Sequence, residues 1–449
     1  MAHIAFFSVA AHGHVSPTLG IVEELVARGH RVTYFTTGEF AEPLRRLGAE
    51  VCRYDLAAAA GGSPRAFADN DPSALPLFFL HGSAERIALA ERQFAGGRPD
   101  LVVYDNTVPF AGRALARRWG CRAVQFFPSL ASSRGYALMD AMLARTGRSA
   151  AHAANSAQFD RRLGAFLAEV GLAGTSAAEF MDFEEELNLA FLPRSFQPEQ
   201  AAFGPHYRFV GPSLGGREAQ GSWQRPADDR PVVLVSLGTV FNRATEFYRS
   251  CLAAFEGSEF AVVMSIGART DPASLGTLPA NVEVHRSVPQ LSVLAQAAAF
   301  VSHGGMGSTM EALALGTPMV VVPQMVEQEL IADRVVELTL GQRLDPAAIT
   351  PAALLAAVRT VGRDPRIADR LARMRRELRA AGGAAAAAEA IEEHLGHPGR
   401  IHGHPGRPAR EAAGRDTAAR AVTAGELTAR DTAARDTAAR DRAGREVAR

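Results

Sequence analysis

The sequence contains no lysine, so arginine supplies all 48 of its basic residues, and these are balanced by 48 acidic residues. A chain with a formal net charge of zero gives no argument for nucleic acid or an anionic membrane as a partner. The absence of lysine beside abundant alanine, arginine and glycine is typical of a GC-rich coding bias rather than of a function.

Cysteine is also scarce, and Cys52, Cys121 and Cys251 lie far apart in the sequence. Their spacing matches neither a metal-ligand motif nor the disulfide framework of a small secreted protein. No uninterrupted apolar run reaches about 18 residues, the length expected of a membrane-spanning helix. The chain opens on an apolar stretch, without the basic region and long apolar segment of a signal peptide. We therefore expect a cytoplasmic protein with no membrane span.

Short apolar runs alternate with helical patterns along most of the chain. In the first part these runs lie at residues 4–9, 32–36, 101–104 and 123–127, and the pattern restarts at 232–238, 260–266, 282–285, 299–302 and 319–322. Such runs, separated by helices, predict parallel sheets covered on both faces. The sequence therefore predicts an α/β protein with two facing Rossmann-like, doubly wound domains and a cleft between them.

Composition also suggests where the domains end. Residues 211–230 are rich in glycine, proline and polar residues, so we expect an N-terminal domain at 1–210, a linker at 211–230 and a C-terminal domain at 231–395. The apolar helical segment 384–395 is expected to pack near the domain junction. The unit Arg-Asp-Thr-Ala-Ala-Arg recurs after residue 396 with almost no apolar periodicity. We therefore expect a low-complexity, disordered tail at 396–449, with a partner-binding tail as the alternative.

A glycine-rich turn follows the apolar run at 299–302. The stretch 301–311 reads Val-Ser-His-Gly-Gly-Met-Gly-Ser-Thr-Met-Glu, which indicates a strand end, a turn and a helix start. Glycine lets the backbone approach a ligand closely, and the free N–H groups at a helix N-terminus favour an anion. His303 adds a donor for a phosphate, and Glu311 adds a carboxylate for two neighbouring sugar hydroxyls. Together these features indicate a nucleotide with a ribose.

A histidine and an aspartate follow two strands of the first predicted sheet. His14 lies in a turn at 10–17, and Asp105 ends the run at 101–104. Both positions project from the carboxyl edge of the sheet, so an aspartate could orient the histidine as a general base. His12 is a competing base, and a plain loop histidine and a helix-capping or turn-forming aspartate are the structural alternatives.

The flanks of the glycine-rich turn make the pattern more specific. Val288, Pro289 and Gln290 precede it, while Gly-Thr-Pro at 316–318 and Glu327-Gln328 follow it. The assembly resembles the donor-binding signature of nucleotide-sugar-dependent glycosyltransferases of the two-domain (GT-B) fold, family 1, and most of all the bacterial macrolide glycosyltransferases. The resemblance extends over about residues 3 to 395. It implies that the N-terminal half binds the acceptor, that the C-terminal half binds the donor, and that His14 is the general base with Asp105 as its partner.

The donor site is expected to involve residues from several loops of the second half. The expected donor-binding residues are Gly238, Thr239, Val288, Gln290, His303, Gly305, Gly307, Ser308, Thr309, Glu311, Glu327 and Gln328. Val288 would pair with the base edge, Gln290 would bond a ribose hydroxyl, and Glu327-Gln328 would hold the transferred sugar. No Asp-x-Asp pair lies where a metal-dependent donor site needs one, so we expect a UDP-sugar as co-substrate with no metal and no cofactor.

Three positions depart from the family pattern. Ser287 replaces the aromatic residue that usually stacks on the base, which leaves base recognition open. Glu327 replaces the more usual aspartate, which leaves the sugar open, and Ser16 replaces the common asparagine after His-Val.

Apolar and aromatic residues gather where the acceptor is expected. The expected acceptor-binding residues are Phe78, Phe79, Phe127, Leu130, Tyr136 and Met139, with Phe126 and Met142 beside them. They suit a bulky hydrophobic acceptor such as a macrolide or polyketide, and ordinary core packing is the alternative for each.

We therefore expect an inverting UDP-glycosyltransferase, a hexosyltransferase that moves glucose to a hydroxyl of a hydrophobic natural product such as a macrolide antibiotic. Resistance and biosynthetic tailoring would both use this reaction. The main alternative is a nucleotide-sugar epimerase or hydrolase of the same architecture, which needs no acceptor base beside an apolar pocket. A nicotinamide dehydrogenase would require Gly-x-Gly-x-x-Gly where this chain has Ala-Ala-His-Gly-His-Val, and a non-catalytic sugar-nucleotide binder would need no His-Asp pair. The oligomeric state stays open.

Overall fold

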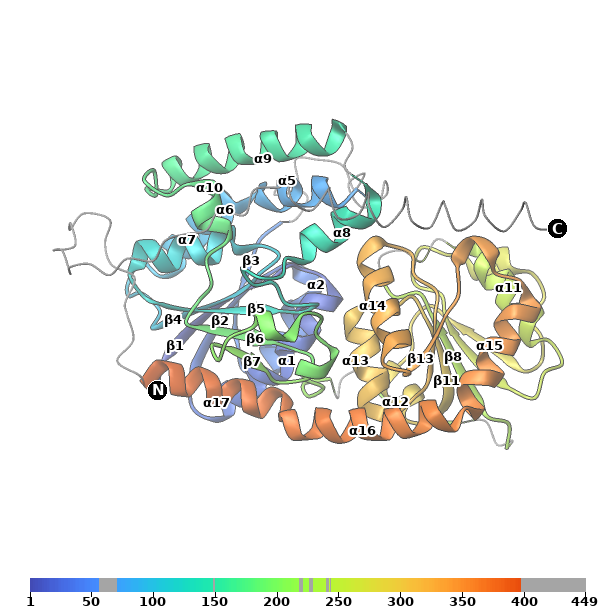
Figure 1. Ribbon diagram of the computed structural model, residues 1–449. Coiled ribbons are helices and arrows are strands. Elements are labelled where there is room, and N and C mark those ends of the chain that lie inside the picture. Colours follow the sequence, from blue (N-terminus) through green and yellow to red (C-terminus); the bar gives the residue numbers. More distant parts are fainter. Residues whose placement is uncertain are drawn as a thin grey trace, which may run out of the picture. The chain divides into compact units, whose positions relative to one another are not determined.

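Two parallel β-sheets organise the computed structural model of this chain (Figure 1). The structure describes residues 1–55, 71–147, 150–217, 221–225, 229–239, 242 and 244–396. The first sheet has the strand order β3 (Glu50–Arg53), β2 (Arg31–Thr36), β1 (His3–Phe7), β4 (Leu101–Asp105), β5 (Arg122–Phe127), β6 (Leu187–Ala190) and β7 (Tyr207–Phe209). The second has the order β10 (Val282–His285), β9 (Ala261–Ser265), β8 (Val232–Ser236), β11 (Ala297–Ser302), β12 (Met319–Val321) and β13 (Gly341–Arg343). The predicted α/β class with two doubly wound sheets is confirmed.

Both sheets reverse their strand order at one point. In the first sheet the chain builds outward from β1 through β2 and β3, then returns to the other side of β1 with β4. In the second sheet the same reversal makes β11 the neighbour of β8. The loops that leave two such strands diverge to opposite faces and open a crevice at the carboxyl edge, where ligands bind in folds of this type.

Helices cover both faces of the first sheet. Successive side chains on a strand point to opposite faces, and on β1 both sets are apolar and need to be buried. On β1, Ile4 and Phe6 pack with α1 (His12–Ala27) and α2 (Gly38–Arg46). Ala5 and Phe7 pack on the other face with α6 (Ser83–Gln93), α7 (Pro109–Trp119) and α9 (Ala150–Glu169). The remaining helices of this half are α5 (Leu75–Leu80), α8 (Leu138–Thr146) and α10 (Ala177–Met181).

The second half repeats the arrangement with its own core. Its helices are α11 (Thr245–Phe255), α12 (Gln290–Leu294), α13 (Met306–Leu315), α14 (Val326–Glu337), α15 (Pro351–Arg363) and α16 (Pro365–Ala381). Helix α13 begins after Gly305 and ends at Gly316, whose φ of +79° is a left-handed conformation that glycine adopts without strain. The glycine-rich stretch predicted to be a turn and a helix start is therefore the connection from β11 to α13.

The last described helix, α17 (Gly383–Gly396), packs against α1 and β6 of the first half (Figure 1). Ala387, Ala388, Ala390 and Ile391 are buried in the same cluster as Ile4 and Phe6 of β1. The end of the second half therefore completes the core of the first half. All described residues belong to one unit, Met1–Pro405. The boundaries at 210, 230 and 395 stay a prediction, and the expected tail lies outside the described residues beyond Gly396.

Most of the predicted strands are present within a residue or two. The sequence analysis missed four short strands, β3, β6, β7 and β13, which lie toward the edges of the sheets. It also placed His14 in a turn, whereas α1 begins at His12 and His14 lies in its first turn. Among the described residues, no helix combines the length and apolar character that crossing a membrane requires.

We expect Ile391→Ala to lower the free energy of unfolding by about 2–5 kcal/mol, the usual cost of truncating a buried aliphatic side chain. Ile391 has no exposed surface and lies in the core cluster of the first half. Urea unfolding measures the effect, and Glu389→Ala, at an exposed position of the same helix, is the matched control. Equal stability of the two variants would contradict the packing of α17 as a core element.

Candidate active site

The two residues predicted to form a base and its partner are in contact. His14 Nδ1 lies 2.7 Å from Asp105 Oδ2, at the point where β1 and β4 are neighbours. Asp105 is fully buried, and Oδ2 also accepts from the hydroxyl of Ser8 and the N–H of Val9, both at 3.4 Å. Oδ1 accepts from the N–H of Thr107 at 2.9 Å. These additional contacts, which the sequence analysis did not include, hold the carboxylate toward His14.

The surroundings of His14 favour its protonated form. Burial lowers the pKa of His14, but the charge and hydrogen bond of Asp105 and the charge of Glu327 raise it, and the resulting pKa lies above 6.5. The side chain of His14 is 25% exposed, whereas that of Asp105 is fully buried. The competing base, His12, pairs instead with Glu39 at 3.1 Å and lies edge-on to Phe40. The geometry therefore supports His14 rather than His12 as the base.

Glu327, in the second half, contacts the first half through a hydrogen bond. It lies in the first turn of α14, and its Oε1 accepts a hydrogen bond from the hydroxyl of Ser129 in the first half. The charge of this carboxylate also contributes to raising the pKa of His14. The sequence analysis assigned no role to Ser129, because a serine after a strand is common and only the fold brings it to α14.

His303 occupies a narrow slot between two glycines of the second half. A Cβ atom added to Gly238 would lie 2.7 Å from the imidazole Cε1 and Nε2, and one added to Gly305 would lie 2.4 Å from Nε2. Both distances are too short for a real Cβ, so the slot requires glycine. Burial lowers the pKa of His303 to about 4, and a hydrogen bond that the ring donates to the backbone of Ser236 opposes this shift. At neutral pH this histidine is therefore uncharged, and its Nδ1 is buried without a hydrogen-bond partner among the described residues.

The first turn of α13 supplies the anion-binding groups expected of the glycine-rich stretch. An α-helix leaves its first N–H groups without internal partners, which here are those of Met306, Gly307 and Ser308. Thr309 differs, because its N–H already donates to Gly305 O at 2.9 Å and its side chain is fully buried. The helix N-terminus can still hold a diphosphate, but without the N–H of Thr309.

Glu311 lies one turn further along α13 and is engaged on both carboxylate oxygens. Oε2 accepts from Gln290 Nε2 at 2.7 Å, and the same amide nitrogen lies 3.0 Å from the Ser308 hydroxyl. Oε1 accepts from Arg217, which the sequence analysis did not include. The structure therefore brings together Gln290, Ser308 and Glu311, the predicted ribose and phosphate residues.

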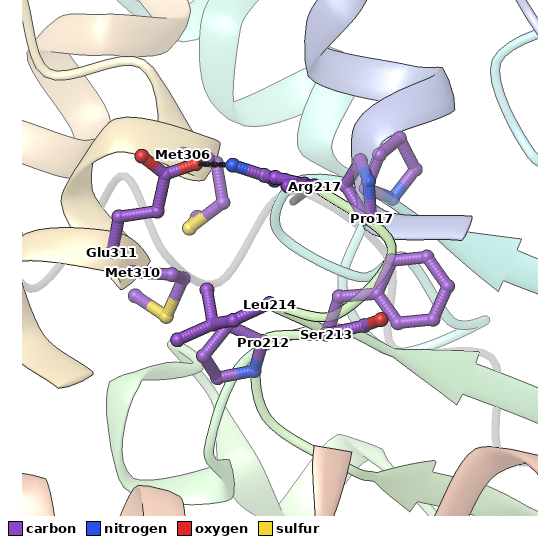
Figure 2. Close-up of a pocket in the computed structure, with 11 residues that line it drawn as sticks. Pro17, Pro212, Ser213, Leu214, Arg217, Met306, Met310 and Glu311 are labelled. Atoms are coloured by element: carbon purple, nitrogen blue, oxygen red, sulfur yellow. Dashed lines mark hydrogen bonds and ion pairs between the residues drawn. The ribbon is translucent and has the colours of Figure 1, made fainter. Parts of the chain in front are cut away.

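A pocket of about 270 Å³, partly open to solvent, lies beside this cluster (Figure 2). It is lined by Pro17, Pro128, Phe191, Pro212, Ser213, Leu214, Arg217, Met306, Gly307, Met310 and Glu311. Its wall is formed by residues of α1, of the segment after β7 and of α13, among others.

The other predicted donor residues are less directly placed. Gln328 is buried, and its Oε1 accepts from the backbone N–H of Gln324 at 2.7 Å, so that oxygen is not available to a sugar. Gly238 follows β8, with Thr239 exposed beside it, and the side chain of Asn242 donates to Gly238 O at 3.1 Å. Val288 is half-buried and packs on the core of the second half, and Ser287 is exposed.

The acceptor candidates divide into two groups. Phe127 and Leu130 are each 1% exposed and belong to the hydrophobic core, so packing accounts for them. Phe78, Phe79, Tyr136 and Met139 are half-buried and stay candidates.

A second pocket of about 290 Å³ is lined by Asp71, Pro72, Leu75, Met142, Met325, Val326 and Glu327. It places apolar residues of both halves beside Glu327, although only Met142 and Glu327 were singled out in the sequence.

No group of three or more His, Cys, Asp or Glu side chains in the described part of the chain is arranged as a metal site. The expectation that the chemistry needs no metal stays a prediction.

Comparisons with known proteins agree on one family. The protein-family model described as "Erythromycin biosynthesis protein CIII-like, C-terminal domain" matches residues 250–393 of this chain. The chain is 39% identical over 394 residues to the NDP-glycosyltransferase YjiC of Bacillus subtilis (strain 168), covering 88% of this chain and 97% of that protein. It is 37% identical over 403 residues to the oleandomycin glycosyltransferase of Streptomyces antibioticus, covering 88% and 91%. The solved structure of CalG4, the calicheamicin glycosyltransferase, matches with a TM-score of 0.78 at 39% identity, covering 89% of this chain and 99% of that one.

We expect Asp105→Asn to lower the pKa of His14, because the substitution removes the nearest negative charge while keeping a side chain of the same shape. NMR titration of the imidazole carbons measures the pKa directly. His12 is an internal control, since it pairs with Glu39 rather than Asp105. An unchanged pKa of His14 would show that Asp105 does not act on it.

Proposed function

Because this chain belongs to the nucleotide-sugar-dependent glycosyltransferases of the GT-B fold, family 1, we propose that it moves a sugar from a UDP-sugar to a hydroxyl of a hydrophobic natural product. Glucose is the proposed sugar, and a macrolide is the proposed kind of acceptor, in keeping with the oleandomycin glycosyltransferase among its relatives. Inactivation of an antibiotic and tailoring during biosynthesis would both use this reaction. The relatives give no support to the epimerase or hydrolase alternative.

The hydrogen bond between His14 and Asp105 is the observation that supports the proposal most strongly. With Nδ1–H donated to the carboxylate, neutral His14 has an unprotonated Nε2 that can accept a proton. In the proposed step, His14 Nε2 takes the proton of the acceptor hydroxyl while that oxygen bonds to the anomeric carbon. The bond from this carbon to the diphosphate oxygen breaks, and UDP leaves from the opposite face with inversion. Asp105 stabilises the imidazolium that forms.

The departing diphosphate would lie at the N-terminus of α13. The N–H groups of Met306, Gly307 and Ser308, together with an N–H of His303, would stabilise its growing negative charge. Glu327 would hold hydroxyls of the transferred sugar, which its electrostatic effect on His14 and its hydrogen bond from Ser129 support. The pocket lined by Leu75, Met142 and Met325 would take an apolar part of the acceptor.

We expect His14→Ala to reduce turnover by about 10²–10⁴-fold, the usual contribution of a general base. UDP binding should persist, because the donor residues lie on the second half. Incubation with UDP-glucose and a panel of macrolides, followed by mass spectrometry for addition of one hexose, measures transfer, and calorimetry measures UDP binding. His12→Ala, which removes a side chain paired with Glu39, is the matched control. Full activity of a folded His14→Ala protein would reject the base assignment.

We expect kcat/KM to fall as the pH decreases through the pKa of His14, which lies above 6.5. Only the neutral imidazole accepts a proton, so activity is present above this pKa and lost below it. Glu327→Gln should move the acid limb to lower pH, because it removes a charge that raises the pKa. Glu329→Gln, two positions further along α14, is the control, since Glu329 pairs with Arg145 and Arg343. An acid limb that Glu327→Gln does not move would contradict the proximity of Glu327 to the base.

A further inference from the structure

The carboxylate proposed to hold the ribose has a cationic partner outside the donor residues considered so far. Arg217, in the segment after β7, donates from Nη1 to Glu311 Oε1, on the opposite side of the carboxylate from Gln290. Figure 2 shows this contact on the wall of the pocket. The side chains of Arg217 and Glu311 are 8% and 7% exposed. The pair is therefore a buried one that borders open space.

The segment that carries Arg217 is fixed against α1. A Cβ atom added to Gly216, whose φ is +73°, would lie 3.0 Å from Leu19 Cβ, and one added to Gly215 would lie 3.6 Å from the Cα of Gly20. The backbone at Gly215 and Gly216 therefore lies directly on the helix that carries His14 in its first turn. From this anchor Arg217 reaches α13 in the second half.

Two observations point to a ligand rather than to packing alone. The Nε of Arg217 is buried and has no hydrogen-bond partner among the described residues, although a buried guanidinium normally satisfies its donors. The pocket that Arg217 lines also includes Gly307 and Glu311, which belong to the proposed donor site. Arg217 thus lines the pocket of the proposed donor site and keeps one donor without a partner among the described residues.

We infer that Arg217 positions Glu311 to accept both ribose hydroxyls, and thereby makes the site prefer a ribonucleoside diphosphate to its 2′-deoxy analogue. This inference rests on the proposed function. A carboxylate offers about four acceptor positions, two on each oxygen. Arg217 uses one on Oε1 and Gln290 uses one on Oε2, so each oxygen keeps one position for a neighbouring hydroxyl. A 2′-deoxyribose leaves one of these buried positions without a partner.

The same contact balances charge. Glu311 lies five residues after Met306, which is at the end of α13 that is proposed to bind the diphosphate. At a rise of 1.5 Å per residue, the two positions are about 7.5 Å apart along the helix axis. An unpaired, buried carboxylate at that distance would repel a diphosphate. Arg217 therefore supports binding of the phosphates by neutralising Glu311, and supports recognition of the ribose by orienting it.

Calorimetric titrations of UDP and 2′-deoxy-UDP into the full chain test the inference. The wild type should bind UDP about 10–100-fold more tightly than 2′-deoxy-UDP, the range expected for one hydrogen bond to a charged group. Arg217→Ala should weaken UDP binding and bring the ratio of the two affinities close to one. Arg217→Lys should recover part of the UDP affinity through its charge while the ratio stays low, because lysine lacks the planar fork that fixes the carboxylate.

Arg208→Ala is the matched control, since Arg208 lies on β7, is 57% exposed and pairs only loosely with Glu393 at 3.5 Å. An Arg217→Ala protein that keeps the wild-type ratio would overturn the inference, and one that binds UDP more tightly would show that Arg217 blocks the site. If Arg217→Ala does not fold, Arg217→Gln provides the same comparison without the charge. A wild type that binds no UDP would instead reject the proposed function.

Discussion

The hydrogen bond of 2.7 Å between His14 and Asp105 is the contact on which the proposed chemistry depends. It forms because the first sheet reverses its strand order, which makes β1 and β4 neighbours although their residues are about a hundred positions apart. Asp105 cannot turn away, because Ser8, Val9 and Thr107 donate to its two oxygens. The carboxylate raises the pKa of His14 against the opposing effect of burial, so the fold sets both the direction of the imidazole and its affinity for a proton.

The second sheet has the same reversal of strand order, which encloses a second histidine. Its order reversal places the loop after β8 against the loop after β11, so that Gly238 and Gly305 enclose His303. Burial keeps His303 neutral, which suits a hydrogen-bond donor to an anion, whereas the partner carboxylate keeps His14 basic. Two histidines that follow comparable strands thus acquire opposite proton affinities from their surroundings. This difference matches the roles proposed for them, since a general base must accept a proton and a phosphate donor need not.

Several contacts link the first half to the second half at the level of single side chains. Ser129 donates to Glu327, Arg217 pairs with Glu311, and Arg145 of α8 pairs with Glu329 and Asp333 of α14. Ser129 and Arg145 belong to the first half, Arg217 lies in the segment after β7, and each carboxylate belongs to the second half. Two of the four carboxylates, Glu327 and Glu311, are proposed ligands of the nucleotide sugar. Binding of the nucleotide sugar would therefore change the hydrogen bonds and ion pairs that join the two halves. The buried pair of Arg217 and Glu311 would be affected most.

The sequence by itself determined the fold class and indicated the candidate reacting groups. Its runs of buried strand residues and its glycine-rich connection are local patterns, and His14, Asp105, His303 and Glu311 could be named from them and from the family resemblance. Tertiary structure alone decided that His14 lies on a helix, that Phe127 and Leu130 are core residues, and that Gln328 is turned toward the backbone. It also brought Ser129 and Arg217 to carboxylates that lie 198 and 94 residues away. The reason is physical: local sequence sets backbone preference and polarity, whereas the burial of a side chain and its long-range partner depend on how whole elements pack.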